Sequence, residues 1–119
     1  MTVLIVEDNA GIRRLLRRTL LETASAIWEC TDGSDALAAY EKHCPDVVLM
    51  DVRMPSVDGL TATKQIRAYD SLARIIIVTD YEDQDLRAAA LEAGAREYVL
   101  KHEISDLPEI ISAVGKPPS

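Results

Sequence analysis

The sequence predicts an α/β domain in which a doubly wound, five-stranded parallel sheet carries helices on both faces. Short apolar runs alternate along the chain with longer segments whose apolar residues recur at helical spacing. The apolar runs are mostly continuous, which is typical of strands buried on both faces, as in a parallel sheet. The length of 119 residues fits one domain, predicted at residues 1–115, followed by a tail or the start of a linker at 116–119.

Five apolar runs are the candidate strands. Four are continuous and rich in aliphatic residues, at residues 3–6, 47–50, 75–78 and 98–100. The fifth, at residues 26–30, is less apolar and fits an edge strand. Each run is followed by a helical pattern, so the expected order is strand and helix repeated five times.

The helical segments are recognised by apolar residues on one side. Their stripes are Ile12, Leu15, Leu16, Thr19 and Leu20; Ala36, Leu37 and Tyr40; Leu60, Thr63, Ile66 and Tyr69; Leu86, Ala89, Ala90 and Ala93; and Ile110, Ile111 and Val114. Helix-end signals accompany them: a turn at residues 32–34, Gly59 at the start of the third segment, and Gly94 as a C-terminal cap. Ser105 is the expected N-cap of the last helix, with Pro108 tolerated in its first turn.

Composition narrows the function. The net charge of −7 argues against a nucleic-acid-binding surface on this domain, because phosphate backbones require a basic footprint. Cys30 and Cys44 lack metal-ligand spacing and are expected to be reduced thiols. The apolar run at residues 3–6 is too short for a signal-peptide core or a membrane span. We therefore expect a cytoplasmic protein that does not associate with a membrane.

Polar residues follow four of the predicted strands at the points where they end. Glu7 and Asp8 follow the first strand, Asp51 the third, Thr79 and Asp80 the fourth, and Lys101 the fifth. Open α/β sheets bind ligands beyond the carboxyl ends of their strands, so these side chains are expected to converge. Singly, each also fits an ordinary role, such as a helix cap for Asp8 or Asn9 and a solvated position for Lys101.

Converging carboxylates favour a cation and phosphoryl chemistry. Closely packed carboxylates repel one another, and a fold tolerates them when a cation neutralises the cluster. All-oxygen ligands favour a hard ion, Mg²⁺ or Mn²⁺. One carboxylate could then act as a nucleophile, as in aspartyl-phosphate chemistry. Lys101 and the cation would offset charge on the transferred group, and Thr79 could donate a hydrogen bond to it.

Three segments carry a resemblance to a known family. Residues 51–59, DVRMPSVDG, resemble the D-x-x-M-P-x-x-D-G loop of response-regulator receiver domains in two-component signal transduction. Residues 3–9 are similar to the first strand and acidic pair of these domains, and residues 94–101 to their fifth strand with its lysine. The resemblance runs from about residue 2 to about 114 and implies a flavodoxin-like (βα)5 fold.

The resemblance implies a phosphoacceptor site. Asp51 would accept a phosphoryl group from a histidine kinase, a histidine phosphotransfer protein or a small phosphodonor. Glu7, Asp8, Asp51 and the backbone carbonyl of Arg53 would hold Mg²⁺ or Mn²⁺, and Lys101 would contact the phosphoryl group. The domain would be a signalling module that assists its own phosphorylation and dephosphorylation, not an enzyme acting on a separate substrate.

The resemblance also implies a conformational switch. Thr79 would move toward the phosphoryl group and Tyr98 would turn inward behind it. The surface around the fourth helix would then change its affinity for partners, and phosphorylation could promote homodimerisation. An output domain outside this sequence could bind DNA.

The sequence departs from the family pattern at two positions. Asp80 follows the switch threonine, where most receivers have a small residue, and Arg53, two residues after Asp51, is close enough in principle to pair with Asp80. Arg53, Asp80 and Tyr81 are expected to crowd the mouth of the site and alter phosphoryl hydrolysis. His102 follows the lysine, where many receivers have proline in a cis peptide, so a trans peptide and a different loop are expected. Together with residues 94–98, this resembles receivers that precede a helix-turn-helix domain.

The first helix is rich in arginine. Arg13, Arg14, Arg17 and Arg18 lie opposite its apolar stripe. Most of them are expected on a solvated face, and some could contact the phosphodonor protein.

Three other functions fit the sequence less well. A metal-dependent phosphatase often places an acid two residues after its nucleophile, where this chain has Arg53, and the chain has no insertion for a substrate pocket. A nucleotide- or flavin-binding module needs a glycine-rich phosphate loop, which residues 7–11 lack. A receiver that works without phosphorylation is disfavoured by the intact Asp51, Thr79 and Lys101, although Asp80 leaves this alternative open.

Overall fold

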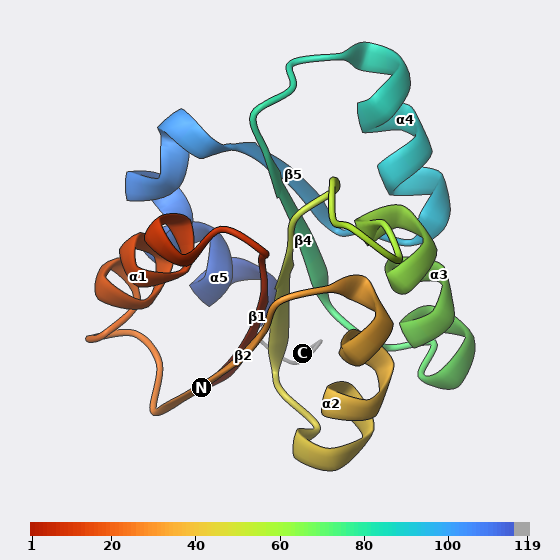
Figure 1. Ribbon diagram of the computed structural model, residues 1–119. Helices are drawn as coiled ribbons and strands as arrows, with labels where there is room; N and C mark the ends of the chain where they lie inside the picture. The colour runs from red at the N-terminus through yellow and green to blue at the C-terminus, as the bar shows by residue number, and fades with distance from the viewer. Residues whose placement is uncertain (116–119) are drawn as a thin grey trace.

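Five parallel strands form a single sheet in the computed structural model, which describes residues 1–115 (Figure 1). The strands are β1 (Thr2–Val6), β2 (Ala26–Cys30), β3 (Val47–Met50), β4 (Ile75–Thr79) and β5 (Glu97–Leu100). Their order across the sheet is β2-β1-β3-β4-β5, so β2 lies at an edge, as its sequence predicted. The strand order reverses between β1 and β3, where a doubly wound sheet leaves a crevice for ligands.

Helices cover both faces of the sheet. They are α1 (Ala10–Thr19), α2 (Ala36–His43), α3 (Gly59–Tyr69), α4 (Gln84–Ala93) and α5 (Leu107–Val114), with 3-10 helices η1 (Gly33–Asp35) and η2 (Lys101–Asp106). Helices α1 and α5 lie on one face, and α2, α3 and α4 lie on the other (Figure 1). The predicted doubly wound α/β fold is confirmed.

Two apolar layers hold the helices to the sheet. Alternate residues of a strand point to opposite faces, so Leu4 packs toward α2, α3 and α4, whereas Ile5 packs toward α1 and α5. Both side chains are fully buried. Ile66 of α3 belongs to the first layer and Ile111 of α5 to the second. Burial on both faces explains why the strands are continuous apolar runs.

Side-chain caps fix several helix starts. Asn9 accepts a hydrogen bond from the Ile12 N–H, Asp58 from the Thr61 N–H, and Asp83 from the Asp85 and Leu86 N–H groups. Gly94 ends α4 with a φ of 113°, which agrees with its predicted role as a C-terminal cap. The α3 stripe ends before Tyr69, whose side chain is exposed.

The expected N-cap at Ser105 is wrong. The chain enters η2 directly after β5, and α5 begins at Leu107, with Pro108 in its first turn as predicted. Ile104 is buried in the same apolar layer as Leu107 and Ile111. Its burial accompanies the 3-10 helix η2, which already contains Ser105, so Ser105 does not cap α5. A cap signal read from local sequence could not anticipate this tertiary contact.

Two further expectations concern the chain as a whole. Within residues 1–115, no helix combines the length and apolar character needed to cross a membrane. The predicted tail at residues 116–119 lies outside the described residues.

Candidate functional site

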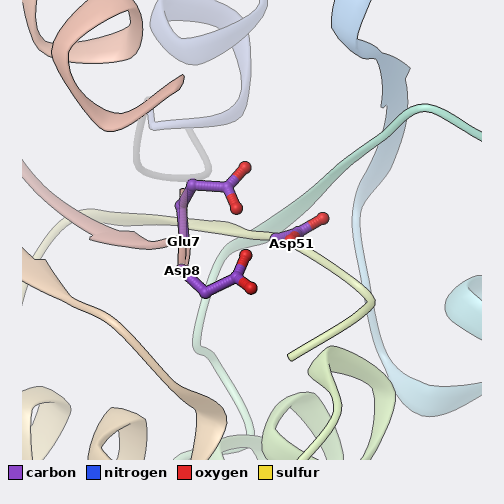
Figure 2. A group of neighbouring side chains, drawn as sticks. All are labelled: Glu7, Asp8 and Asp51. Carbon is purple, nitrogen blue, oxygen red and sulfur yellow. The ribbon is translucent and has the colours of Figure 1, made fainter. Parts of the chain in front are cut away.

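The ends of β1 and β3 bring three carboxylates together. The Asp51 N–H donates to the Val6 carbonyl at 2.9 Å, and the Glu7 N–H donates to the Cys30 carbonyl at 3.0 Å, which holds both residues at the sheet edge. Oxygens of Glu7, Asp8 and Asp51 lie within 4.8 Å of one another (Figure 2). Glu7 and Asp51 are buried, whereas Asp8 is exposed. The predicted convergence at this edge is therefore present.

Lys101 reaches the same cluster from β5. Its Nζ lies 2.8 Å from Glu7 Oε1, 3.5 Å from Asp51 Oδ1 and 3.8 Å from Asp80 Oδ2. The lysine side chain is 13% exposed, so water screens these ion pairs only partly. The ammonium group therefore lies among the carboxylates and not on a solvated surface.

The buried cluster contains more acidic groups than basic groups. Burial and the neighbouring Asp51 raise the pKa of Glu7 to about 7, and burial also raises the pKa of Asp51 against the opposing effect of Lys101. Burial alone would lower the pKa of Lys101, but its hydrogen bond to Glu7 raises it on balance. One ammonium group does not compensate three carboxylates. The all-oxygen donor set therefore fits a hard divalent cation such as Mg²⁺ or Mn²⁺.

The loop after Asp51 is closed tightly on itself. Asp51 Oδ1 accepts a hydrogen bond from the Val52 N–H at 2.9 Å, and the Gly59 N–H donates to the Val52 carbonyl at 2.8 Å. A Cβ at Gly59 would lie 1.9 Å from the Asp51 carbonyl oxygen. Glycine is therefore required at this position by the close approach of the backbone.

Arg13 supports the acidic pair from α1. Its Nη1 donates to the carbonyls of Glu7 at 2.8 Å and Asp8 at 3.0 Å, and its Nε lies 3.4 Å from Glu29 Oε1. Arg17 also pairs with Glu29, at 2.8 Å. No sequence signal marks this supporting role, because nothing in the pattern distinguishes Arg13 from the other arginines of the helix.

Arg14 and Arg18 differ from the other two arginines of α1. Both are exposed, which agrees with the solvated face expected for most of this group.

Thr79 and Tyr98 are joined through the loop that follows β4. Thr79 is fully buried, and its Oγ1 accepts a hydrogen bond from the Tyr81 N–H at 3.2 Å. Tyr98 is 5% exposed, and its hydroxyl donates to the Tyr81 carbonyl. The Arg87 guanidinium lies 4.7 Å from the centre of the Tyr98 ring. Both predicted switch residues therefore contact the backbone of Tyr81.

Arg53 and Asp80 do not form an ion pair, although their pairing was possible in principle. The Arg53 guanidinium lies 4.2 Å from the centre of the Tyr81 ring, while Asp80 lies 3.8 Å from Lys101. The lysine attracts the carboxylate, and the aromatic face offers the guanidinium a stacking surface.

A pocket of about 420 Å³ opens beside this stack. It is lined by Val52, Arg53, Asp80, Tyr81, Glu82, Asp83 and Leu86. The three residues predicted to crowd the mouth therefore line one pocket. The Lys101–His102 peptide is trans, as expected, since residues 1–115 contain no cis peptide.

Comparisons with known proteins place this geometry in a family. The chain matches the model of the response regulator receiver domain over residues 3–114. It is 34% identical over 115 residues to the chemotaxis protein CheY of Bacillus subtilis (strain 168), which covers 96% of this chain and 94% of that protein. It is 42% identical over 117 residues to the transcriptional regulatory protein PdtaR of Mycobacterium tuberculosis (strain CDC 1551 / Oshkosh), covering 96% of this chain and 57% of that protein.

A solved structure has the same fold as this chain. A two-component response regulator of the LuxR family from Aurantimonas sp. SI85-9A1 superposes with a TM-score of 0.89 at 32% identity, covering 96% of this chain and 84% of that one. The shared fold extends over nearly the whole chain. The chain therefore belongs to the family of response-regulator receiver domains.

Proposed function

We propose that this receiver domain is a phosphoacceptor switch that takes a phosphoryl group on Asp51 in the presence of Mg²⁺ or Mn²⁺. The donor would be a histidine kinase, a histidine phosphotransfer protein or a small phosphodonor. The observation that carries the proposal is the contact of Lys101 Nζ with both Glu7 and Asp51, within a cluster of three carboxylates.

The cation would be held by side chains at two strand ends. Glu7, Asp8 and Asp51 supply carboxylate oxygens, and the backbone carbonyl of Arg53 is the proposed fourth protein ligand. When bound, Mg²⁺ supplies positive charge that offsets the charge developing on the phosphoryl oxygens. Arg13 holds the backbone of Glu7 and Asp8 and so orients two of these ligands.

The transfer uses the carboxylate of Asp51 as its nucleophile. Because Oδ1 accepts from the Val52 N–H and faces Lys101, we assign the attack to Oδ2. The Oδ2–P bond forms as the bond from phosphorus to the donor breaks, and the leaving group keeps that electron pair. The Lys101 ammonium offsets negative charge on the transferred group. Thr79 Oγ1 accepts from the Tyr81 N–H, and its hydroxyl proton would be the one donated to a phosphoryl oxygen.

The switch would run from Thr79 to Tyr98 through Tyr81. Movement of Thr79 toward the phosphoryl group displaces the Tyr81 N–H that it holds, and the Tyr81 carbonyl is the acceptor for the Tyr98 hydroxyl. The position of Tyr98 would therefore depend on phosphorylation, and the surface of α4 would change with it. This surface would control partner or output-domain binding, including homodimerisation on phosphorylation.

The proposed setting is a two-component pathway in the cytoplasm. Residues 1–115 would form the receiver domain. The net charge of −7 disfavours direct DNA binding by this domain. Because one similar solved structure is a DNA-binding response regulator of the LuxR family, an output domain outside this sequence could bind DNA.

Intact-protein mass spectrometry tests the proposal. The protein is incubated with acetyl phosphate, with and without Mg²⁺, alongside Asp51→Asn and Asp8→Asn. We expect wild type to gain one phosphoryl mass only with Mg²⁺, Asp51→Asn to gain none, and Asp8→Asn to require more Mg²⁺. An unmodified wild type would contradict the proposal and favour an interaction domain that works without phosphorylation. Continuous turnover of a phosphomonoester would favour a phosphatase.

The Arg53–Tyr81 stack is expected to influence how fast the phosphoryl group is lost. The stack borders the pocket that is also lined by Asp80 and by Val52, the residue that follows Asp51. We expect Arg53→Ala to change the hydrolysis rate of phosphorylated protein, measured by mass spectrometry after the donor is removed. Arg96→Ala, which alters an exposed arginine at the opposite end of β5, is the control. Equal rates in wild type and Arg53→Ala would argue against any role for the stack.

A further inference from the structure

Asp32 connects the turn after β2 to the loop after Asp51. One carboxylate oxygen of Asp32 accepts from the Ser56 N–H at 2.9 Å. The other accepts from the N–H groups of Val57 at 3.1 Å and Ser34 at 2.8 Å. A single side chain therefore binds a backbone donor of its own turn and two backbone donors of a loop that lies 24 and 25 residues further along the sequence.

The two loops also touch through their backbones. A Cβ at Gly33 would lie 2.3 Å from the Val57 carbonyl oxygen and 3.2 Å from the Asp58 carbonyl oxygen. Only glycine leaves room for this approach. The backbone contact of Gly33 does not depend on the hydrogen bonds of Asp32. Both interactions hold the loop at Val57.

The anchored part of the loop lies close to the proposed cation ligand. Only Met54 and Pro55 separate Arg53 from Ser56, and the proline ring fixes φ, so a displacement at Ser56 is transmitted toward Arg53. The other end of the loop is fixed by the hydrogen bond from the Gly59 N–H to the Val52 carbonyl. The Arg53 carbonyl therefore lies between two anchors.

We propose that Asp32 is a positioning residue for the cation site, which it sets by holding the loop that carries the Arg53 carbonyl. The inference rests on the proposed function, because it presumes that the cluster of Glu7, Asp8 and Asp51 takes up a divalent cation. Asp32 itself does not touch the cation. Groups that orient metal ligands commonly alter metal affinity by roughly 10–100-fold when they are removed.

The charge of Asp32 is suited to this role. Hydrogen bonds from the N–H groups of Ser56, Ser34 and Val57 lower the pKa of Asp32 to about 2, so the carboxylate is ionised at neutral pH. Its three hydrogen bonds are therefore charge-assisted. Asparagine would offer one oxygen and an amide NH₂, which places a donor against at least one of these backbone donors.

The first test measures cation binding directly. Mn²⁺ is titrated into wild type, Asp32→Asn and Asp35→Asn, and free Mn²⁺ is followed by its electron paramagnetic resonance signal. We expect Asp32→Asn to bind Mn²⁺ about 10-fold more weakly than wild type. Asp35→Asn makes the same change of charge at an exposed neighbour whose side chain does not cap α2, and it should bind like wild type.

The second measurement separates positioning from stability. With acetyl phosphate, Asp32→Asn should require about 10-fold more Mg²⁺ but reach the wild-type extent of phosphorylation at saturation. A purely structural role would lower the thermal unfolding temperature of the metal-free protein while leaving both metal midpoints unchanged, and this result would overturn the inference. If wild type neither binds Mn²⁺ nor becomes phosphorylated, the proposed function itself is overturned, and not only the role of Asp32.

A second variant covers the case in which Asp32→Asn does not fold. Gly33→Ala keeps the carboxylate but pushes the Val57 carbonyl away, so it should weaken Mn²⁺ binding in the same direction. Circular dichroism establishes that each variant is folded before its metal titration is compared. Wild-type Mn²⁺ affinity in a folded Gly33→Ala protein would count against positioning through this loop.

Discussion

Cys44 has an unusual backbone conformation at the end of α2. Apart from glycine, it is the one residue with a positive φ within residues 1–115, at 45°, and its N–H donates to the Tyr40 carbonyl at 2.8 Å. The left-handed conformation ends many helices, but glycine usually occupies it because a Cβ there is crowded by the following carbonyl. The side chain of Cys44 is exposed, its thiol is not in a disulfide, and its Sγ donates to the Glu41 carbonyl at 3.6 Å, so the strained backbone serves no packing role.

Cys44→Gly should therefore stabilise the protein. The variant removes the Cβ crowding of about 1–2 kcal/mol, and the greater freedom of glycine in the unfolded chain offsets part of this gain. We expect a net increase of about 0.5–1 kcal/mol in the free energy of unfolding, measured by urea denaturation. Cys44→Ala, which removes the thiol but keeps the Cβ, is the control. If both variants gained equally, the thiol and not the backbone would be responsible.

Tyr98 contributes a single buried hydrogen bond that can be removed without disturbing its ring. Tyr98→Phe leaves the Tyr81 carbonyl without this donor while the ring remains next to Arg87. We expect a loss of about 1 kcal/mol in unfolding free energy and faster amide hydrogen exchange in residues 80–83. Tyr81→Phe removes a hydroxyl from a side chain that is 40% exposed, and it should change neither quantity. Unaltered exchange in Tyr98→Phe would show that the loop is held by other contacts.

At the scale of elements, strands and strand ends are the most predictable features. A parallel sheet places the carboxyl ends of its strands at one edge. The proximity of Asp51 and Lys101, which each follow a strand, could therefore be predicted from the sequence alone. The start of α5 could not be predicted, because it depends on the burial of Ile104. The support from Arg13 and Asp32 could not be predicted either, since both bind backbone groups whose positions depend on the completed fold.

The connection between η1 and the loop after β3 gives the protein a specific acid sensitivity. Hydrogen bonds from the N–H groups of Ser56, Ser34 and Val57 lower the pKa of Asp32 from 3.8 to about 2 on folding. Because the folded pKa is depressed, this stabilisation is fully present above about pH 4 and is lost as the pH falls through about 2.

Urea unfolding between pH 7 and pH 2 measures this contribution. Wild type should be more stable than Asp32→Asn at neutral pH, and the difference should shrink between about pH 4 and pH 2. Asp35→Asn should follow the pH dependence of wild type. Parallel curves for wild type and Asp32→Asn would mean that the charge of Asp32 does not contribute to stability.

For the molecule as a whole, the carboxylate cluster opposes the stability that the core provides. Two apolar layers hold the sheet between its helices, yet burial raises the pKa of both Glu7 and Asp51. A raised carboxyl pKa means that the charged form is disfavoured in the folded state. The metal-free domain should therefore lose stability as the pH rises from about 4.5 through about 7, where Glu7 gives up its proton. Functional sites commonly carry such a cost.

Asp51→Asn should consequently stabilise the domain when no metal is present. The amide removes one buried charge, and its oxygen can still accept from the Val52 N–H. In EDTA at pH 8 we expect a gain on the order of 1 kcal/mol in unfolding free energy, and a smaller gain at pH 5, where wild-type Glu7 is protonated and no longer repels Asp51. Asp106→Asn, at an exposed carboxylate that makes no side-chain cap, should show no gain at either pH.

Addition of Mg²⁺ should reverse this order. Mass action stabilises the protein that binds the cation, so wild type gains more than Asp51→Asn, which has lost a ligand. Thermal unfolding at increasing Mg²⁺ concentration should show the wild-type midpoint rising toward and past that of the variant. If Asp51→Asn is no more stable than wild type in EDTA, Lys101 already compensates the cluster, and the argument that the site requires a divalent cation loses its energetic basis.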